Sequence, residues 1–206
     1  MIKVCGMREP ENIRAVEAVG IDMMGFIFYP RSSRYVASVP DYLPSSLRRV
    51  GVFVNASEED MLHHITEYGL DYVQLHGAER PEVCDILHAS GVNVIKAFSV
   101  ACADDLRSCV EYEGHADIFL FDTKCQQYGG SGERFDWAIL DAYTGDTPFL
   151  LSGGIGPSGI EDLVSFHHPK CCGVDLNSRF EISPAYKDAD MLRQFINEYR
   201  RIENER

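Results

Sequence analysis

The chain has 206 residues, 45% of them hydrophobic and 25% charged, which is typical of one globular domain and not of a disordered or fibrous protein. Its formal net charge of −13, from 32 acidic and 19 basic residues, disfavours nucleic acids and anionic membranes as partners, because both repel an acidic protein. The apolar runs also stay below the roughly 18–20 residues that a membrane span requires.

Cysteines and histidines give no pattern of a disulfide framework or a metal site. The seven cysteines are odd in number and scattered, without a CxxC pair, and no signal peptide is expected ahead of Met1-Ile2-Lys3. We therefore expect a cytoplasmic protein. Two histidine pairs, at 63–64 and 167–168, are adjacent in sequence, so their side chains point in different directions instead of converging on one ion. No metal is expected.

Apolar segments of strand length alternate with helical patterns along the whole chain. They are continuously hydrophobic, which is typical of parallel strands buried on both faces. The expected strands are 2–5, 23–28, 49–54, 72–75, 94–98, 118–121, 149–151 and 172–175. The expected helices or helical turns are 10–19, 40–47, 57–68, 81–89, 103–112, 136–142, 158–166 and 188–203.

Eight strand–helix units in about 200 residues predict an α/β fold, a single-domain parallel eight-stranded (βα)8 TIM barrel over residues 1–206. An open doubly wound sheet would usually stop at five to seven strands. Active sites of such barrels form at the C-terminal ends of the strands, so residues there are the candidates for chemistry.

Three strand ends carry small or hydroxyl residues whose backbone N–H groups can approach a phosphate closely. One glycine pair alone would be an ordinary turn, but three such segments at successive strand ends favour a phosphorylated substrate. The segments contain Gly130, Ser131 and Gly132, then Gly153 and Gly154, and then Asp175, Asn177 and Ser178.

Cys5 and Asp122 end two strands that are not neighbours in the expected ring. A buried cysteine is usually a small core residue, but a thiol at a strand end with Arg8 nearby could act as a general base. Asp122 could simply pair with Lys124, yet partial desolvation at a barrel mouth would raise its pKa toward that of a proton donor. Asp175 is the rival acid.

Three further polar residues follow strand ends. Arg34, before the bulky Tyr35, could aim its planar guanidinium at a carboxylate, whereas Arg31 fits a solvated loop. Gln74 and His76 flank the end of the fourth strand and could form hydrogen bonds across the mouth, although a buried histidine with satisfied hydrogen bonds is the more common case.

The combination and order of several segments resemble the phosphoribosylanthranilate isomerase family of the tryptophan pathway. They are KVCGM at 3–7, GFIFYPRSSRYV at 25–36, VGVFVN at 50–55, VQLHG at 73–77, FDTK with YGGSGERFDW at 121–137, LLSGGIGP at 150–157 and GVDLNSRFE at 173–181. Together they cover essentially the whole chain.

This resemblance implies an Amadori rearrangement of N-(5-phosphoribosyl)anthranilate to 1-(2-carboxyphenylamino)-1-deoxyribulose 5-phosphate, without a cofactor. It assigns the acid that protonates the furanose oxygen to Asp122, the base at C2′ to Cys5 and the ligand of the anthranilate carboxylate to Arg34. The implied phosphate cradle comprises Gly130-Ser131-Gly132, Gly153-Gly154 and Asn177-Ser178. Members of the family are monomers or homodimers, and the sequence does not choose between them.

Arg179 departs from the family, which usually has glycine after the serine that ends the eighth strand. An arginine tolerates positive φ poorly, and it could instead bind phosphate or support a partner surface. The alternative functions are another sugar-phosphate barrel enzyme, of the epimerase or indole-glycerol-phosphate synthase type, and a barrel that binds phosphorylated ligands without catalysis. Lys3 lies inside its strand instead of at the tip, which disfavours the synthase.

Overall fold

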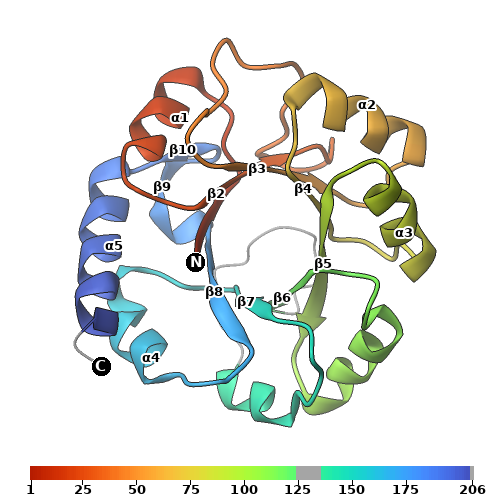
Figure 1. Ribbon diagram of the computed structural model, residues 1–206. Helices are drawn as coiled ribbons and strands as arrows, with labels where there is room; N and C mark the ends of the chain where they lie inside the picture. The colour runs from red at the N-terminus through yellow and green to blue at the C-terminus, as the bar shows by residue number, and fades with distance from the viewer. Residues whose placement is uncertain (124–135, 205–206) are drawn as a thin grey trace.

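The protein forms a closed parallel barrel in the computed structural model, which describes residues 1–123 and 136–204. Figure 1 looks along the barrel axis, with the strands in a ring and the helices outside it. The ring runs in sequence order from β1 to β8 and closes by pairing β8 with β1. Its strands are β1 (Ile2–Cys5), β2 (Met23–Ile27), β3 (Arg48–Phe53), β4 (Tyr72–Leu75), β5 (Asn93–Val100), β6 (Ile118–Thr123), β7 (Phe149–Leu151) and β8 (Cys171–Leu176). The predicted fold is confirmed.

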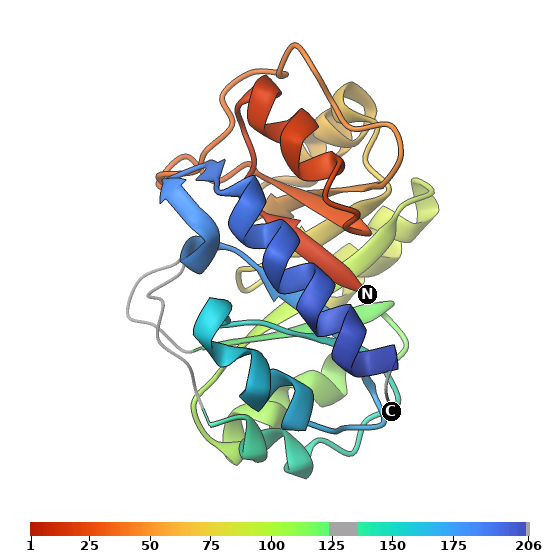
Figure 2. The ribbon, with the colours of Figure 1, turned by 90° about the vertical axis from the view of Figure 1, so that its left-hand side faces the viewer.

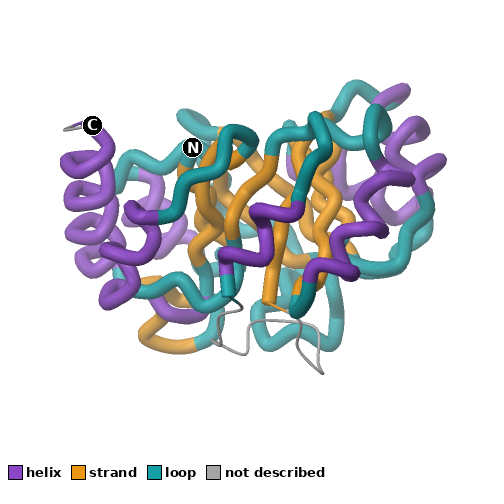
Figure 3. The backbone as a smooth tube through the Cα atoms, turned by 90° about the horizontal axis from the view of Figure 1, so that it is seen from below, coloured by secondary structure: helices purple, strands orange, loops and turns teal. Residues whose placement is uncertain are grey.

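Helical segments surround the strands, as the side view in Figure 3 also shows. The α-helices are α1 (Pro10–Glu17), α2 (Glu58–Tyr68), α3 (Pro81–Ala89), α4 (Ile160–Ser165) and α5 (Ala189–Asn204). The 3₁₀ segments are η1 (Ala103–Tyr112), η2 (Trp137–Ala142), η3 (Pro157–Gly159) and η4 (Ser178–Phe180). Ser57 caps α2 by accepting a hydrogen bond from the Asp60 backbone N–H at 3.1 Å. Figure 2 shows α5 crossing the outside of the barrel between α1 and α4.

One expectation about local structure was wrong, and one pair of strands was not expected. The segment 40–47 forms bends and no helix, because Pro40 and Pro44 lack backbone N–H donors and disfavour helical geometry in the residues before them. The antiparallel hairpin of β9 (Glu181–Ser183) and β10 (Tyr186–Lys187), which lies between β8 and α5, was not predicted. Strands of two or three residues are too short to show a periodic apolar pattern.

The strands bury alternate side chains inside and outside the barrel. In β6, Ile118 and Leu120 belong to the small cluster inside the barrel, whereas Phe119 and Phe121 belong to the larger cluster under the helices. The same alternation places Asp122 above Leu120 on the inner face. Polar residues that continue the inner face beyond the apolar layers therefore meet at the C-terminal end of the barrel.

Candidate active site

A pocket opens at the C-terminal end of the barrel. The inner-facing residues of the strand ends line it together with residues of the following loops: Cys5, Ile27, Tyr29, Ser32, Val52, Val54, Gln74, His76, Asp122, Ser152, Gly153, Gly154, Ile155, Asp175, Asn177 and Ser178. Most of the predicted site residues are thus brought together in one cavity. Gly130, Ser131 and Gly132 lie outside the described residues.

Asp122 lies one residue before the end of β6, with its carboxylate partly enclosed. Its Oδ1 accepts a hydrogen bond from the Thr123 backbone N–H at 2.8 Å. Gly153, at φ +83°, packs against this strand end, where a Cβ would lie 2.2 Å from Thr123 Oγ1 and 3.0 Å from Asp122 Oδ1. Burial, followed by the negative charge of Asp175, raises the pKa of Asp122 to about 6. The shift has the direction expected for a proton donor.

Gln74 and His76 form a polar chain that leads to Asp122. The Gln74 amide nitrogen lies 2.9 Å from His76 Nδ1, and His76 Nε2 lies 3.8 Å from Asp122 Oδ2. Burial and the charge of Lys3 lower the pKa of His76 to about 4, so the imidazole is uncharged at neutral pH. The Gln74 Oε1 atom is buried and accepts no hydrogen bond from any described residue.

Cys5 lies above a buried ion pair inside the barrel. The Lys3 side chain is fully buried, and its Nζ donates to Asp175 Oδ1 at 2.8 Å. Ser152 Oγ donates to the other Asp175 oxygen at 3.3 Å, so both carboxylate oxygens have protein partners. Burial raises the pKa of Cys5 above its ordinary value even though Lys3 opposes the shift, and the resting group is therefore a thiol. Sequence reasoning did not find the Lys3–Asp175 pair.

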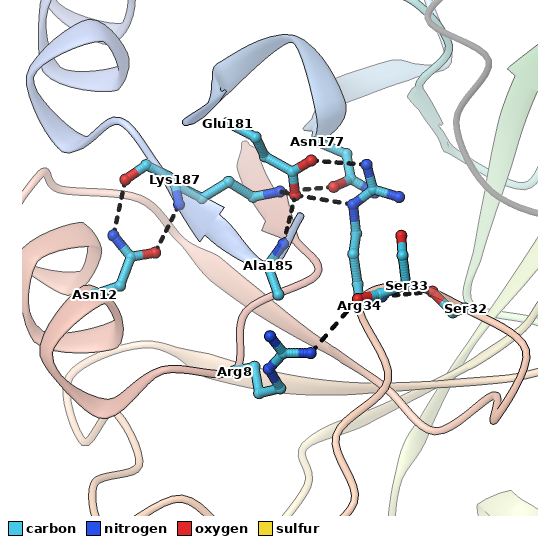
Figure 4. Close-up of polar contacts among 9 residues, drawn as sticks. All are labelled: Arg8, Asn12, Ser32, Ser33, Arg34, Asn177, Glu181, Ala185 and Lys187. Atoms are coloured by element: carbon cyan, nitrogen blue, oxygen red, sulfur yellow. Dashed lines mark hydrogen bonds and ion pairs between the residues drawn. The ribbon is translucent and has the colours of Figure 1, made fainter. Parts of the chain in front are cut away.

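Arg34 does not line the pocket, although it lies next to residues that do. Its Nε and Nη2 donate to Glu181 Oε1 and Oε2 at 2.8 and 2.7 Å, and Lys187 Nζ donates to Glu181 Oε1 at 2.6 Å (Figure 4). Glu181 and Lys187 come from the unpredicted hairpin. Its charged residues alone gave no sign that they would be buried beside Arg34.

Arg179 causes no backbone strain in the position where glycine was expected. It lies in η4, and it is not among the residues with positive φ. A Cβ on Gly156 would lie 3.1 Å from Arg179 Cβ, so the side chain starts against the loop that follows β7.

Two further observations concern the described part of the chain. None of its helices has both the length and the apolar character needed to cross a membrane. Within the same residues, no three histidine, cysteine or carboxylate side chains are grouped so that they could hold a metal ion.

The sequence and the fold were compared with known proteins. The family model of N-(5′-phosphoribosyl)anthranilate (PRA) isomerase matches residues 2–198. The N-(5′-phosphoribosyl)anthranilate isomerase of Phocaeicola vulgatus is 56% identical over 198 residues, which cover 96% of this chain and 97% of the relative. The crystal structure of phosphoribosyl anthranilate isomerase from Thermotoga maritima has a TM-score of 0.82 at 33% identity, covering 97% and 98% of the two chains.

A phosphoribosyl anthranilate isomerase in complex with reduced 1-(o-carboxyphenylamino)-1-deoxyribulose 5-phosphate has a TM-score of 0.79 at 32% identity, covering 97% of each chain. The sequence relatives and the solved structures thus agree over nearly the full length of the chain. The chain belongs to the N-(5′-phosphoribosyl)anthranilate isomerase family, the isomerases of tryptophan biosynthesis.

Proposed function

We propose that this pocket binds N-(5′-phosphoribosyl)anthranilate and catalyses its Amadori rearrangement, with Asp122 as general acid and Cys5 as general base. The observation that carries the assignment is their placement: the two side chains line one pocket from strands that are not neighbours. A substrate between them can receive a proton from one residue and lose a proton to the other.

The proposed reaction begins with proton transfer from Asp122 to the furanose ring oxygen. The nitrogen lone pair of the anthranilate group forms a C=N bond as the C1′–O bond breaks, which gives a Schiff base. The Cys5 thiolate then removes the C2′ proton, and the electrons of that C–H bond form an enolamine. Tautomerisation of the enolamine yields the ketone product. The elevated pKa of Asp122 keeps a protonated fraction available near neutral pH.

Substrate binding divides between the two ends of the ligand. Backbone N–H groups around Gly153, Gly154, Asn177 and Ser178 are proposed to hold the phosphate, because these residues line the pocket at the ends of β7 and β8. Gly130, Ser131 and Gly132 remain proposed members of the same cradle. Arg34 is proposed to bind the anthranilate carboxylate.

The direct test is turnover of freshly prepared phosphoribosylanthranilate, followed by the decay of its fluorescence. The wild-type protein should convert it without added metal or nucleotide, and the product should contain the 1-deoxyribulose group. Absence of turnover, or turnover that EDTA abolishes and a divalent ion restores, would contradict the proposal and favour an epimerase-type barrel. Whether the active protein is a monomer or a homodimer stays a prediction for sedimentation analysis.

A further inference from the structure

A buried cluster of three charged side chains joins the β9–β10 hairpin to the barrel beside the pocket. Glu181 Oε1 accepts from Arg34 Nε at 2.8 Å, from Lys187 Nζ at 2.6 Å and from the Ala185 backbone N–H at 3.2 Å. Glu181 Oε2 accepts from Arg34 Nη2 at 2.7 Å. The exposed fractions of the Arg34, Glu181 and Lys187 side chains are only 10%, 6% and 0%. Buried ion pairs of this kind are costly to form, so stability alone does not explain the presence of this cluster.

The pairing occupies one edge of the Arg34 guanidinium and leaves the other edge open. A guanidinium can bind a carboxylate through its Nε–Nη2 edge or through its Nη1–Nη2 edge. Glu181 occupies the first edge. Within the described part of the chain no residue accepts a hydrogen bond from Nη1, and Nη1 is not among the buried atoms that lack a partner. Among the described residues nothing therefore competes for Nη1 with an anion from outside the protein.

The cluster also contacts the backbone next to Cys5, the proposed base. Gly6 follows Cys5 at φ +79°, and a Cβ on it would lie 2.6 Å from Arg34 Cδ and 3.0 Å from Asn177 Oδ1. The absence of a side chain at Gly6 thus lets Arg34 lie across the backbone next to the proposed base. Lys187 Nζ donates to Asn177 Oδ1 at 2.6 Å, and Asn177 lines the pocket (Figure 4).

The charges of the cluster do not cancel. Two cations, Arg34 and Lys187, surround the single carboxylate of Glu181, which leaves one positive charge in a protein whose formal net charge is −13. The Asn12 side chain donates to the Lys187 backbone carbonyl at 2.8 Å and accepts from the Lys187 backbone N–H at 2.7 Å. These two hydrogen bonds fix Lys187 in place. Without Lys187, Glu181 would neutralise Arg34 completely.

We infer that Glu181 is a positioning residue, which holds the Nε–Nη2 edge of Arg34 so that the Nη1 edge receives the carboxylate of the substrate. Lys187 offsets the charge of Glu181 and leaves the site attractive to an anion. The inference rests on the proposed function, because it assumes that Arg34 binds the carboxylate. It adds a residue far from Arg34 in sequence to the determinants of substrate specificity.

The test compares binding of two probes by calorimetry. One is the reduced product, 1-(2-carboxyphenylamino)-1-deoxyribulose 5-phosphate with its ketone reduced, and the other is the same molecule without the carboxylate. Glu181→Gln should weaken binding of the carboxylated probe by about tenfold or more and that of the carboxylate-free probe by less than about twofold. The KM of phosphoribosylanthranilate should rise while kcat changes little.

Matched variants separate positioning from general stability. Glu198→Gln breaks another two-bond pair, of Glu198 with Arg201 on α5 at 2.7 and 3.1 Å, and should change neither affinity. If Glu181→Gln does not fold, Glu181→Asp serves instead, because the shorter side chain keeps the charge of the cluster but withdraws the carboxylate from the Nε–Nη2 edge of Arg34, and it should show the same loss specific to the carboxylated probe.

Several results would overturn the inference. An equal loss with both probes would make Glu181 a structural residue, and tighter binding of the carboxylated probe would make it a competitor for Arg34. Unchanged binding would also contradict it. Failure of the proposed function is recognised separately: Arg34→Lys would then bind both probes as the wild type does, whatever Glu181→Gln shows.

Discussion

The two sides of the pocket differ in how they handle charge. The side formed by β4 and β6 carries Gln74, a neutral His76 and Asp122, whose pKa is raised to about 6. The side formed by β1, β8 and the β9–β10 hairpin carries two buried clusters, Lys3 with Asp175, and Arg34 with Glu181 and Lys187. The first side makes a carboxylate easier to protonate. The second concentrates positive charge next to a thiol.

This difference shows how an acidic protein can build a site for an anionic substrate. On the hairpin side, each carboxylate is placed between donors, and the cations outnumber the carboxylates, so the summed formal charge of these buried groups is opposite in sign to that of the whole molecule. On the β6 side, no cation among residues 1–123 and 136–204 is in hydrogen-bond contact with Asp122, and burial disfavours the charged form of this carboxyl group. The proposed acid therefore needs surroundings that disfavour negative charge, whereas the site for the anionic substrate needs surroundings that favour it.

The comparison is tested most strongly by removing the proposed acid from one side of the pocket and the proposed base from the other. Asp122→Asn and Cys5→Ala should each lower kcat by at least ~10²-fold with little change in substrate affinity, because a positioned acid or base acts mainly in the transition state. Steady-state kinetics with a binding assay for the reduced product would measure both quantities. Near-normal turnover in either variant would remove that residue from the mechanism.

Arg34→Lys tests whether the hairpin side recognises the carboxylate by geometry or only by charge. An ammonium keeps the charge but cannot form two parallel hydrogen bonds, so binding of carboxylated analogues should weaken by about 1–3 kcal/mol. Analogues without the carboxylate should bind the wild type and the variant almost alike. The assignment of Arg34 would be withdrawn if calorimetry gave the same loss with both sets of analogues.

The side formed by β4 and β6 was predictable from sequence, as was Cys5. Apolar strands bury alternate residues on the inner face, so Gln74, His76 and Asp122 follow from counting in steps of two along strands that the sequence identifies. The bounds of β1, β4 and β7 match the predicted ranges, and those of the other strands differ by one or two residues at one or both ends. The residues around a strand are thus enough to predict its ends to within one or two positions.

The hairpin side was only partly predictable, because its contacts join distant residues. Glu181 lies 147 positions from Arg34 along the chain, and the short strands β9 and β10 show no apolar period. Nothing in the sequence near Arg34 indicates that a carboxylate of the protein occupies one edge of its guanidinium. Likewise Lys3, which was noted only for its place inside a strand, proves to be fully buried against Asp175.

The pH dependence of kcat/KM should reflect both sides of the pocket at once. In the proposed mechanism the reactive form has a protonated Asp122 and a Cys5 thiolate, although burial raises the pKa of each group. Activity should therefore rise with pH up to about 6, because the thiolate fraction increases while Asp122 stays protonated. Above pH 6 the protonated fraction of Asp122 falls as pH rises, but the thiolate fraction of Cys5 increases by the same factor. The value of kcat/KM should therefore stay on a plateau into the alkaline range. A pH–rate profile that falls between pH 6 and 8 would contradict this assignment.

The last expected effect concerns stability, and it separates the β6 side from ordinary surface carboxylates. The pKa of Asp122 is 3.8 in its ordinary state and about 6 in the folded protein, so its charged form opposes folding above pH 6 and the cost disappears as pH falls below about 4. Asp122→Asn should thus increase the free energy of unfolding at pH 8 by about 1–3 kcal/mol and leave it nearly unchanged at pH 4. Asp104, whose side chain is 76% exposed, offers the control Asp104→Asn, which should change stability little at either pH. Urea unfolding at the two pH values measures the difference. If Asp122→Asn destabilised the protein at pH 8, the hydrogen bond from Thr123 would outweigh the desolvation of the carboxylate, and the β6 side would stabilise the charged form of its acid.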